Sequence, residues 1–211
     1  MPEPLCLQPP LAGLAAFVQE RLAGAQPGHG WGHVERVFRL AAWLAERTGA
    51  RAEIVLPAAL LHDVGRVEEV GEGIDHAEAS ARIARQVLPA WGYPPAQVEE
   101  IVQCILAHRF SSGPPPATLE AQVLSDADKL DALGAVGIAR TFLHGGAEGR
   151  GLAESLPHFH HKLLRLGEHL YTEPARRLAA GRLAYMRGFL QRLAAEQQGG
   201  PEENGLATVG E

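Results

Sequence analysis

Apolar residues recur along this chain at intervals of three and four, and this spacing constrains the fold more than any other feature. Val34, Val37, Phe38, Ala41 and Leu44 form one such stripe, and similar stripes follow in three later segments. Intervals of three and four place side chains on one face of an α-helix, whereas a half-buried strand needs strict alternation. No run of five or more residues combines alternation with β-branched side chains. The sequence therefore predicts an all-α fold without a significant sheet.

Gly and Pro residues separate the stripes and set the expected ends of the helices. The chain is also richer in Ala and Leu than in Val, Ile and Thr, which favours helices over strands. We expect helices near residues 11–23, 31–48, 54–64, 76–91, 95–109, 118–132, 134–143, 153–170 and 173–197. The glycine-rich segment 145–151 is expected to be a loop, either a lid over a substrate or a plain connector.

The length of 211 residues suits one compact domain, because a chain of this size buries enough surface to be stable without covalent staples. We expect this domain to span residues 1–198. Residues 199–211 are rich in Gly and Glu and poor in apolar side chains, which predicts a disordered tail. Apolar stripes left over after one core is formed make a homodimer a reasonable expectation.

Charge and cysteine content exclude several classes of protein. The net charge of −6 argues against binding of a nucleic acid polymer, which depends on clustered Lys and Arg. No apolar stretch reaches the roughly 18–20 residues that a membrane span requires, so no membrane partner is expected. Cys6 and Cys104 cannot build a disulfide framework. Because the first ten residues lack the basic start of a signal peptide, we expect a cytoplasmic protein.

Several of the ten histidines lie on the apolar stripes of the predicted helices. His33, His62 and His108 occupy such positions, as does Asp128, and Asp63 follows His62 directly. A buried imidazole or carboxylate needs a partner, because burial without one is costly. Taken singly, His33 is explained by a hydrogen-bonded core histidine and Asp128 by a surface position. Taken together, helices that bring these side chains to one place would satisfy them by binding a divalent cation.

The ligand types narrow the choice of metal. Imidazole and carboxylate without thiolate suit an open octahedral site rather than a closed structural zinc site. We expect manganese (Mn²⁺) or magnesium (Mg²⁺), with Fe²⁺, Co²⁺ and Ni²⁺ as alternatives. One metal ion is favoured over two.

The order of these residues resembles the HD-domain metal-dependent phosphohydrolases, and more narrowly a small bacterial branch that includes nucleotide pyrophosphohydrolases. The resemblance runs from about residue 28 to 195. Its motifs are the segments 31–37, 60–65, 75–80 and 128–141, together with His158-Phe159 and Lys162. It implies a single HD-type helical domain with a metal site in the core.

The resemblance also implies roles for individual residues. It makes His33, His62, Asp63 and Asp128 the metal ligands, with Asp63 also placed to bridge to the attacking water or to orient it. His76 and His108 would line the pocket and contact phosphate or protonate the leaving group, or would hold a second metal. The branch often shows His-Asp-Trp where this chain has His29-Gly30-Trp31. This chain therefore lacks the carboxylate that could orient His29 or a metal-bound water in that branch.

Basic residues supply candidates for binding substrate phosphate. Lys129 and Lys162 are the only two lysines, and both fall within the motif-bearing stretches. A compact ammonium suits a phosphate, so both are candidates, and Lys129 is also counted among the catalytic residues. Further candidates are Arg36, Arg140 and His158, with a solvated helix face as the alternative for the two arginines. The remaining histidines are expected at the surface or as supports behind the site residues: His144, His160, His161 and His169.

The function expected from the sequence is that of a metal-dependent phosphohydrolase. A metal-activated water would attack a phosphoryl group of a nucleotide or of another small phosphate ester or anhydride. Two alternatives stay open: a di-iron oxygenase that uses His76 and His108 as ligands, and a catalytically silent helical sensor that binds a nucleotide. Asp126-x-Asp128 also resembles the motif of haloacid-dehalogenase-type phosphatases, but that chemistry requires a parallel strand.

Overall fold

The computed structural model of the chain describes residues 7–25, 28–68, 73–109 and 114–199. The α-helices are α1 (Leu11–Arg21), α2 (Trp31–Thr48), α3 (Ala52–Leu61), α5 (His76–Val87), α6 (Pro95–Ala107), α7 (Leu119–Asp131), α8 (Gly134–Ala147), α9 (Leu152–His161) and α10 (Glu173–Gln197). Two 3₁₀-helices, η1 (Leu88–Trp91) and η2 (Leu163–His169), complete the elements. No strand occurs within these ranges, which confirms the predicted all-α fold.

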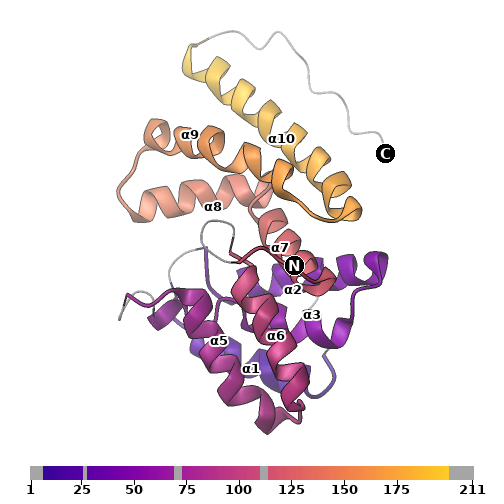
Figure 1. The fold of residues 1–211 in the computed structure, drawn as a ribbon. Helices are drawn as coiled ribbons and strands as arrows, with labels where there is room; N and C mark the ends of the chain where they lie inside the picture. The colour runs from indigo at the N-terminus through magenta and orange to yellow at the C-terminus, as the bar shows by residue number, and fades with distance from the viewer. Residues whose placement is uncertain (1–6, 26–27, 69–72, 110–113, 200–211) are drawn as a thin grey trace.

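The helices form one compact domain around a continuous apolar core (Figure 1). Helices α2, α3, α6 and α7 pack on one another in its middle, and α5 packs against α6. Figure 1 shows α8, α9 and α10 together at one end of the molecule and α1 and α5 at the other. None of the described helices combines the length and apolar character needed to cross a bilayer.

Helix α3 is buried on nearly all sides, and it ends earlier than the sequence pattern suggests. The predicted helix 54–64 stops at Leu61, so His62 and Asp63 lie on the tight turn that follows it. A Cβ atom on Gly65 would lie 2.5 Å from the backbone nitrogen of Ser80 in α5. The Gly65 amide also donates to the Ser80 hydroxyl at 2.9 Å. Only a glycine allows this turn to approach α5 so closely, and the turn sets the position of Asp63.

Three other predicted segments end differently in the structure. The helix predicted over 76–91 changes to 3₁₀ geometry at Leu88, beside Pro89. The helix predicted over 153–170 breaks at Lys162, whose φ of −128° is outside the helical region, and continues as η2. Helix α8 extends through Gly145 and Gly146, because Gly145 packs against Ser155 with no room for a Cβ. Only residues 148–151 therefore connect α8 to α9, which favours the plain connector over the lid.

Candidate metal centre

Five segments that are distant in sequence bring imidazole and carboxylate groups to one place in the core. His33 comes from the first turn of α2, His76 begins α5, and His108 follows α6. These three side chains are buried, as are His62 and Asp63 on the turn after α3. Asp128 comes from α7, and 31% of its side chain is exposed. The structure thus brings together the four residues predicted as metal ligands, with His76 and His108 beside them.

Hydrogen bonds fix which nitrogen of His33 and His62 faces the cluster. The Nδ1 atom of His62 lies 2.9 Å from the carbonyl oxygen of Ala59, and Nδ1 of His33 lies 2.7 Å from Oδ2 of Asp131. Both partners accept hydrogen bonds, so each Nδ1 carries the proton. The two Nε2 atoms then point lone pairs at each other across 3.2 Å. This arrangement is unfavourable by itself, and a cation bound by both nitrogens relieves it.

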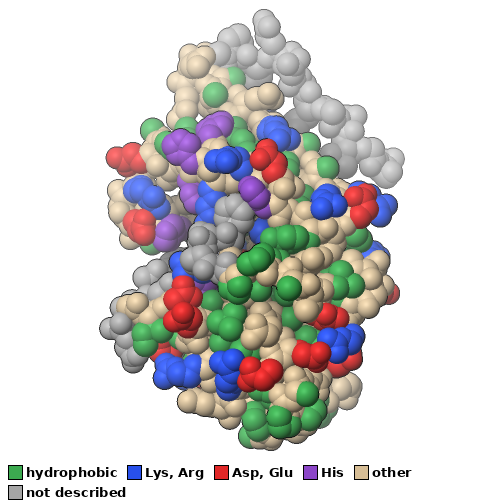
Figure 2. Space-filling model, viewed as in Figure 1, with side chains coloured by type: hydrophobic (Ala, Val, Ile, Leu, Met, Phe, Trp, Pro, Cys, Tyr) green, Lys and Arg blue, Asp and Glu red, His purple; other side chains and the backbone are tan. Residues whose placement is uncertain are grey.

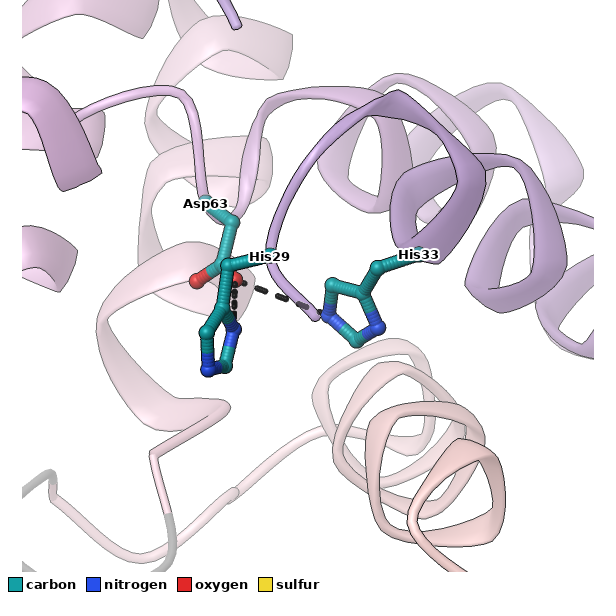
Figure 3. Close-up of side chains that lie close together, drawn as sticks. All are labelled: His29, His33 and Asp63. Atoms are coloured by element: carbon teal, nitrogen blue, oxygen red, sulfur yellow. Dashed lines mark ion pairs between the residues drawn. The ribbon is translucent and has the colours of Figure 1, made fainter. Parts of the chain in front are cut away.

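Asp63 lies at the centre of the cluster, and its two oxygens face different imidazoles. Oδ2 lies 3.5 Å from Nδ1 of His29 and 3.5 Å from Nε2 of His33, as Figure 3 shows. Oδ1 lies 3.6 Å from Nε2 of His76 and 3.8 Å from Nε2 of His108. Oδ1 is buried and has no hydrogen-bond partner within the described part of the chain. A buried carboxylate oxygen without a partner is costly, so its placement fits a bound cation.

Three sets of ligand atoms within the described residues are close enough to share a metal ion. They are His29, His33 and Asp63; His33, His62 and Asp128; and Asp63, His76 and His108. Within each set the ligand atoms lie within 4.8 Å of one another. Asp63 belongs to two sets, so His76 and His108 lie close enough to Asp63 to share a metal ion with it. The preference for one metal ion over two stays a prediction.

Burial and neighbouring charges give these groups the protonation states that a cation requires. Burial lowers the pKa of His62 to about 4 and also lowers the pKa of His108. Burial opposes ionisation of Asp63, but the nearby His62, His29 and Arg66 outweigh it and hold its pKa well below the usual value. The pKa of Asp128 is lowered in the same way, chiefly by His33 and His62. Neutral imidazoles and ionised carboxylates are the forms that coordinate metals.

A cavity of about 390 Å³ lies beside the cluster. Its lining includes Glu148, which pairs with Arg150 and His144, and six basic side chains. These are His29, Arg140, His144, Arg150, His158 and Lys162. The view in Figure 2 shows His, Lys and Arg side chains gathered over the α8–α9 end of the molecule. His29 lines this cavity and also lies beside Asp63, so it connects the cavity to the cluster.

The predicted phosphate ligands fall into two groups. Arg140, His158 and Lys162 line the cavity together, although they come from α8, α9 and the break after α9. His144 lines it too, although it was not among the predicted phosphate ligands. Arg150 was missed by the sequence analysis, because it lies in a glycine-rich connector without helical periodicity.

Arg36 and Lys129 are not among the residues that line this cavity. Arg36 forms a two-pronged ion pair with Asp131 and lines a separate, more apolar groove. Lys129 is buried and donates to the carbonyl oxygen and hydroxyl of Ser125. Its ammonium also lies 4.9 Å from the centre of the Tyr171 ring. These contacts weigh against a direct phosphate contact for either residue.

The departure at Gly30 has a local structural meaning. Gly30 is the N-cap of α2, and no side chain caps this helix end. An aspartate at this position would accept hydrogen bonds from the first turn of the helix that carries His33. The chain therefore lacks a stabilising cap here, but His29 still lies beside Asp63.

Comparison with known proteins places this arrangement in a family. The family model of the HD domain matches residues 30–133. The protein YpgQ of Bacillus subtilis is 35% identical over 194 residues, which is 88% of this chain and 93% of that protein. The chain belongs to the HD-domain superfamily, as its motifs predict.

Solved structures agree with this assignment. The structure of Bacillus subtilis YpgQ in complex with ADP has a TM-score of 0.74 and 32% identity, covering 88% of this chain and 97% of that one. A predicted HD superfamily hydrolase from an uncultured Thermotogales bacterium has a TM-score of 0.71 and 33% identity, with coverages of 90% and 94%. An HD-superfamily hydrolase from Bacillus thuringiensis has a TM-score of 0.72 and 32% identity, with coverages of 89% and 96%. Family and neighbours together indicate a metal-dependent hydrolase.

Proposed function

We propose that this protein is a metal-dependent phosphohydrolase that acts on a nucleotide or another small phosphate ester or anhydride. The observation that carries the proposal is the contact of His29 with both parts of the site. His29 lies 3.5 Å from Asp63 in the metal cluster and also lines the basic cavity. A phosphate group held by the cavity would therefore lie next to the cation ligands.

The chain's own residues divide the work as follows. His33, His62, Asp63 and Asp128 would hold the cation. When bound, a divalent cation supplies a Lewis acid for a phosphoryl oxygen and lowers the pKa of a coordinated water. Asp63 is suited to orient the attacking water, because its Oδ1 atom is buried and accepts no hydrogen bond from the described residues.

The basic side chains have a different task, which is to hold and neutralise phosphate. Phosphoryl transfer depends mainly on positioning and on stabilising negative charge. Arg140 offers a planar guanidinium and Lys162 a compact ammonium, which suit phosphate oxygens in different ways. His76 and His108 lie within 3.8 Å of Asp63, so they are candidates to contact the phosphate or to protonate the leaving group.

Support for a nucleotide substrate comes from the relatives. Bacillus subtilis YpgQ was crystallised in complex with ADP, and its fold covers most of this chain. A cavity with basic residues on several elements complements the charge of the phosphates of such a ligand.

One observation favours a second candidate function. The set of Asp63, His76 and His108 provides ligands for a second metal ion, as a di-iron oxygenase would require. The cavity favours phosphoryl chemistry instead, because its lining includes Arg140, His158 and Lys162, which suit the negative charge of phosphate. Loading with Fe²⁺ under anaerobic conditions, followed by measurement of oxygen consumption, separates the two functions.

The test of the proposed function is a panel of nucleotides with Mn²⁺, Mg²⁺, Co²⁺ and Ni²⁺, in which orthophosphate and pyrophosphate are measured separately. We expect turnover with at least one metal, and loss of turnover and of bound metal in Asp63→Ala and Asp128→Ala. Glu99→Ala is the matched control, because Glu99 is an exposed acid that forms an ion pair with Arg85. Wild-type turnover in either aspartate variant contradicts the proposal. Nucleotide binding without turnover under any metal would indicate the silent sensor.

A further inference from the structure

Asp131 connects the metal cluster to two arginines that lie outside it. It is the last residue of α7, three positions after Asp128, and its side chain is 1% exposed. Its Oδ2 atom lies 2.7 Å from Nδ1 of His33. Nε of Arg36 lies 2.6 Å from Oδ1, and Nη2 of Arg36 lies 3.0 Å from Oδ2. Nη1 of Arg140 also donates to Oδ2.

These contacts determine the state of both Asp131 and His33. Two guanidinium groups in direct contact keep the Asp131 carboxylate ionised, and an ionised carboxylate only accepts hydrogen bonds. His33 must then donate from Nδ1. Its Nε2 lone pair consequently faces His62 Nε2 at 3.2 Å and Asp128 Oδ1 at 3.4 Å.

His33 differs in this respect from two other imidazoles of the centre. Nδ1 of His62 and Nδ1 of His108 each face a backbone carbonyl of the preceding helix, at Ala59 and Ile105. Those two rings are thus held by the backbone of α3 and α6. The carbonyl three residues before His33, that of Gly30, already accepts the backbone amide of His33. The orientation of the His33 ring therefore depends on a side chain from another helix.

We propose that Asp131 is a positioning residue of the metal centre, which fixes the tautomer and orientation of His33. Arg36 serves the same centre through its ion pair with Asp131 and does not bind substrate phosphate. The proposal deepens the proposed function and rests on the metal centre described there. Partners of this kind, which hold a metal-ligating histidine, commonly change metal affinity 10- to 100-fold when they are removed.

The first test compares two asparagine variants of α7 in metal binding. Asp131→Asn keeps the side-chain shape but replaces one acceptor oxygen with a donor, and we expect Mn²⁺ affinity measured by calorimetry to fall about 10- to 100-fold. Asp126→Asn is the matched control. Asp126 is equally buried on α7, but it accepts from the amides of Tyr171 and Thr172 instead of from a histidine. Unchanged Mn²⁺ affinity in Asp131→Asn, or an equal loss in both variants, overturns the proposal.

The second test separates the two arginines, using inorganic phosphate as the probe and the metal-free protein. Arg140 lines the basic cavity and Arg36 does not. We expect Arg140→Gln to weaken phosphate binding several-fold, and Arg36→Gln to leave it unchanged while weakening Mn²⁺ binding. A loss of phosphate affinity in Arg36→Gln that equals the loss in Arg140→Gln would refute the role given to Arg36.

A third measurement needs no variant and decides the matter if Asp131→Asn does not fold. Long-range ¹H–¹⁵N spectra of the metal-free wild-type protein report which nitrogen of His33 carries the proton. We expect the proton on Nδ1, and a proton on Nε2 alone would overturn the proposal. This readout also distinguishes a failure of the proposed function from a failure of the role proposed for Asp131. A wild-type protein that binds no divalent cation refutes the proposed function, whereas the His33 tautomer still tests the role of Asp131.

Discussion

Acidification should destabilise the metal-free protein, because His62 is buried in its neutral form. The side chain is fully buried, and burial lowers its pKa from 6.5 to about 4. Between these two values the unfolded chain binds a proton that the folded chain excludes. The stabilisation from this residue is therefore complete above pH 6.5 and is lost as the pH falls toward 4.

The size of the effect follows from the two pKa values of His62. A fall from 6.5 to about 4 corresponds to about 3.4 kcal/mol when fully expressed, at about 1.36 kcal/mol per pKa unit. Between pH 8 and pH 5, the linkage relation gives a loss of about 2 kcal/mol in the free energy of unfolding. Such a loss is a large fraction of the stability of an ordinary domain.

Urea unfolding at pH 8 and pH 5, in the presence of a chelator, measures this loss. His62→Gln keeps an amide donor for the carbonyl of Ala59 but does not titrate. From pH 8 to pH 5, its free energy of unfolding should therefore fall by about 2 kcal/mol less than that of the wild type. His160→Gln is the control at an exposed histidine, and it should keep the pH dependence of the wild type. Equal losses in the wild type and in His62→Gln would refute the reasoning.

Three further predictions concern the centre, the cavity and the turn that positions Asp63. At 100 times its Kd, Mn²⁺ should stabilise the wild type by about 2.7 kcal/mol and raise Tm by roughly 5–11 °C for a chain of this size. Asp63→Asn should show little of this rise in thermal melts. A full rise in this variant would contradict the role of Asp63 as a ligand. Lys162→Gln should lower kcat/KM for the phosphorylated substrate about 10-fold, mainly through KM, and unchanged kinetics would exclude the cavity as the phosphate site. Gly65→Ala should destabilise the protein by about 1–3 kcal/mol in urea unfolding, because its Cβ would meet Ser80. Gly146→Ala, where the Cβ would meet open space, should be neutral or stabilising, and equal effects of the two substitutions would refute the packing argument.

The helical architecture was predictable because it is encoded locally. The stripe from Val34 to Leu44 predicts a buried helix face without knowledge of its partner, and α2 has the predicted bounds of 31–48. The ends of other helices were less predictable, because they depend on neighbours. Helix α8 continues past Gly145 to Ala147, and Gly145 packs so closely on Ser155 of α9 that no side chain would fit there. Local sequence alone favours a loop at such a glycine pair.

The metal cluster was predictable in membership but not in geometry. His33, His62, Asp63 and Asp128 stand out because polar groups on apolar stripes need a shared partner. The contact between Asp131 and His33 could have been suspected, because Asp131 lies three residues after Asp128 in the same motif. Its two arginine partners come from α2 and α8, and nothing in the local sequence pairs them with α7.

The sequence by itself determined that this chain is helical, that it has an apolar core, and that His33, His62 and His108 enter that core. These properties follow from side-chain periodicity within single helices. Only the tertiary structure decided that Arg140, His144, Arg150, His158 and Lys162 share one cavity, and that Arg36 turns to Asp131 instead. The physical reason is that an exposed or half-buried basic side chain has no periodic constraint on its direction. The groups that such a side chain contacts depend on how α8 and α9 pack against the rest of the fold, because this packing brings together residues that are distant in sequence.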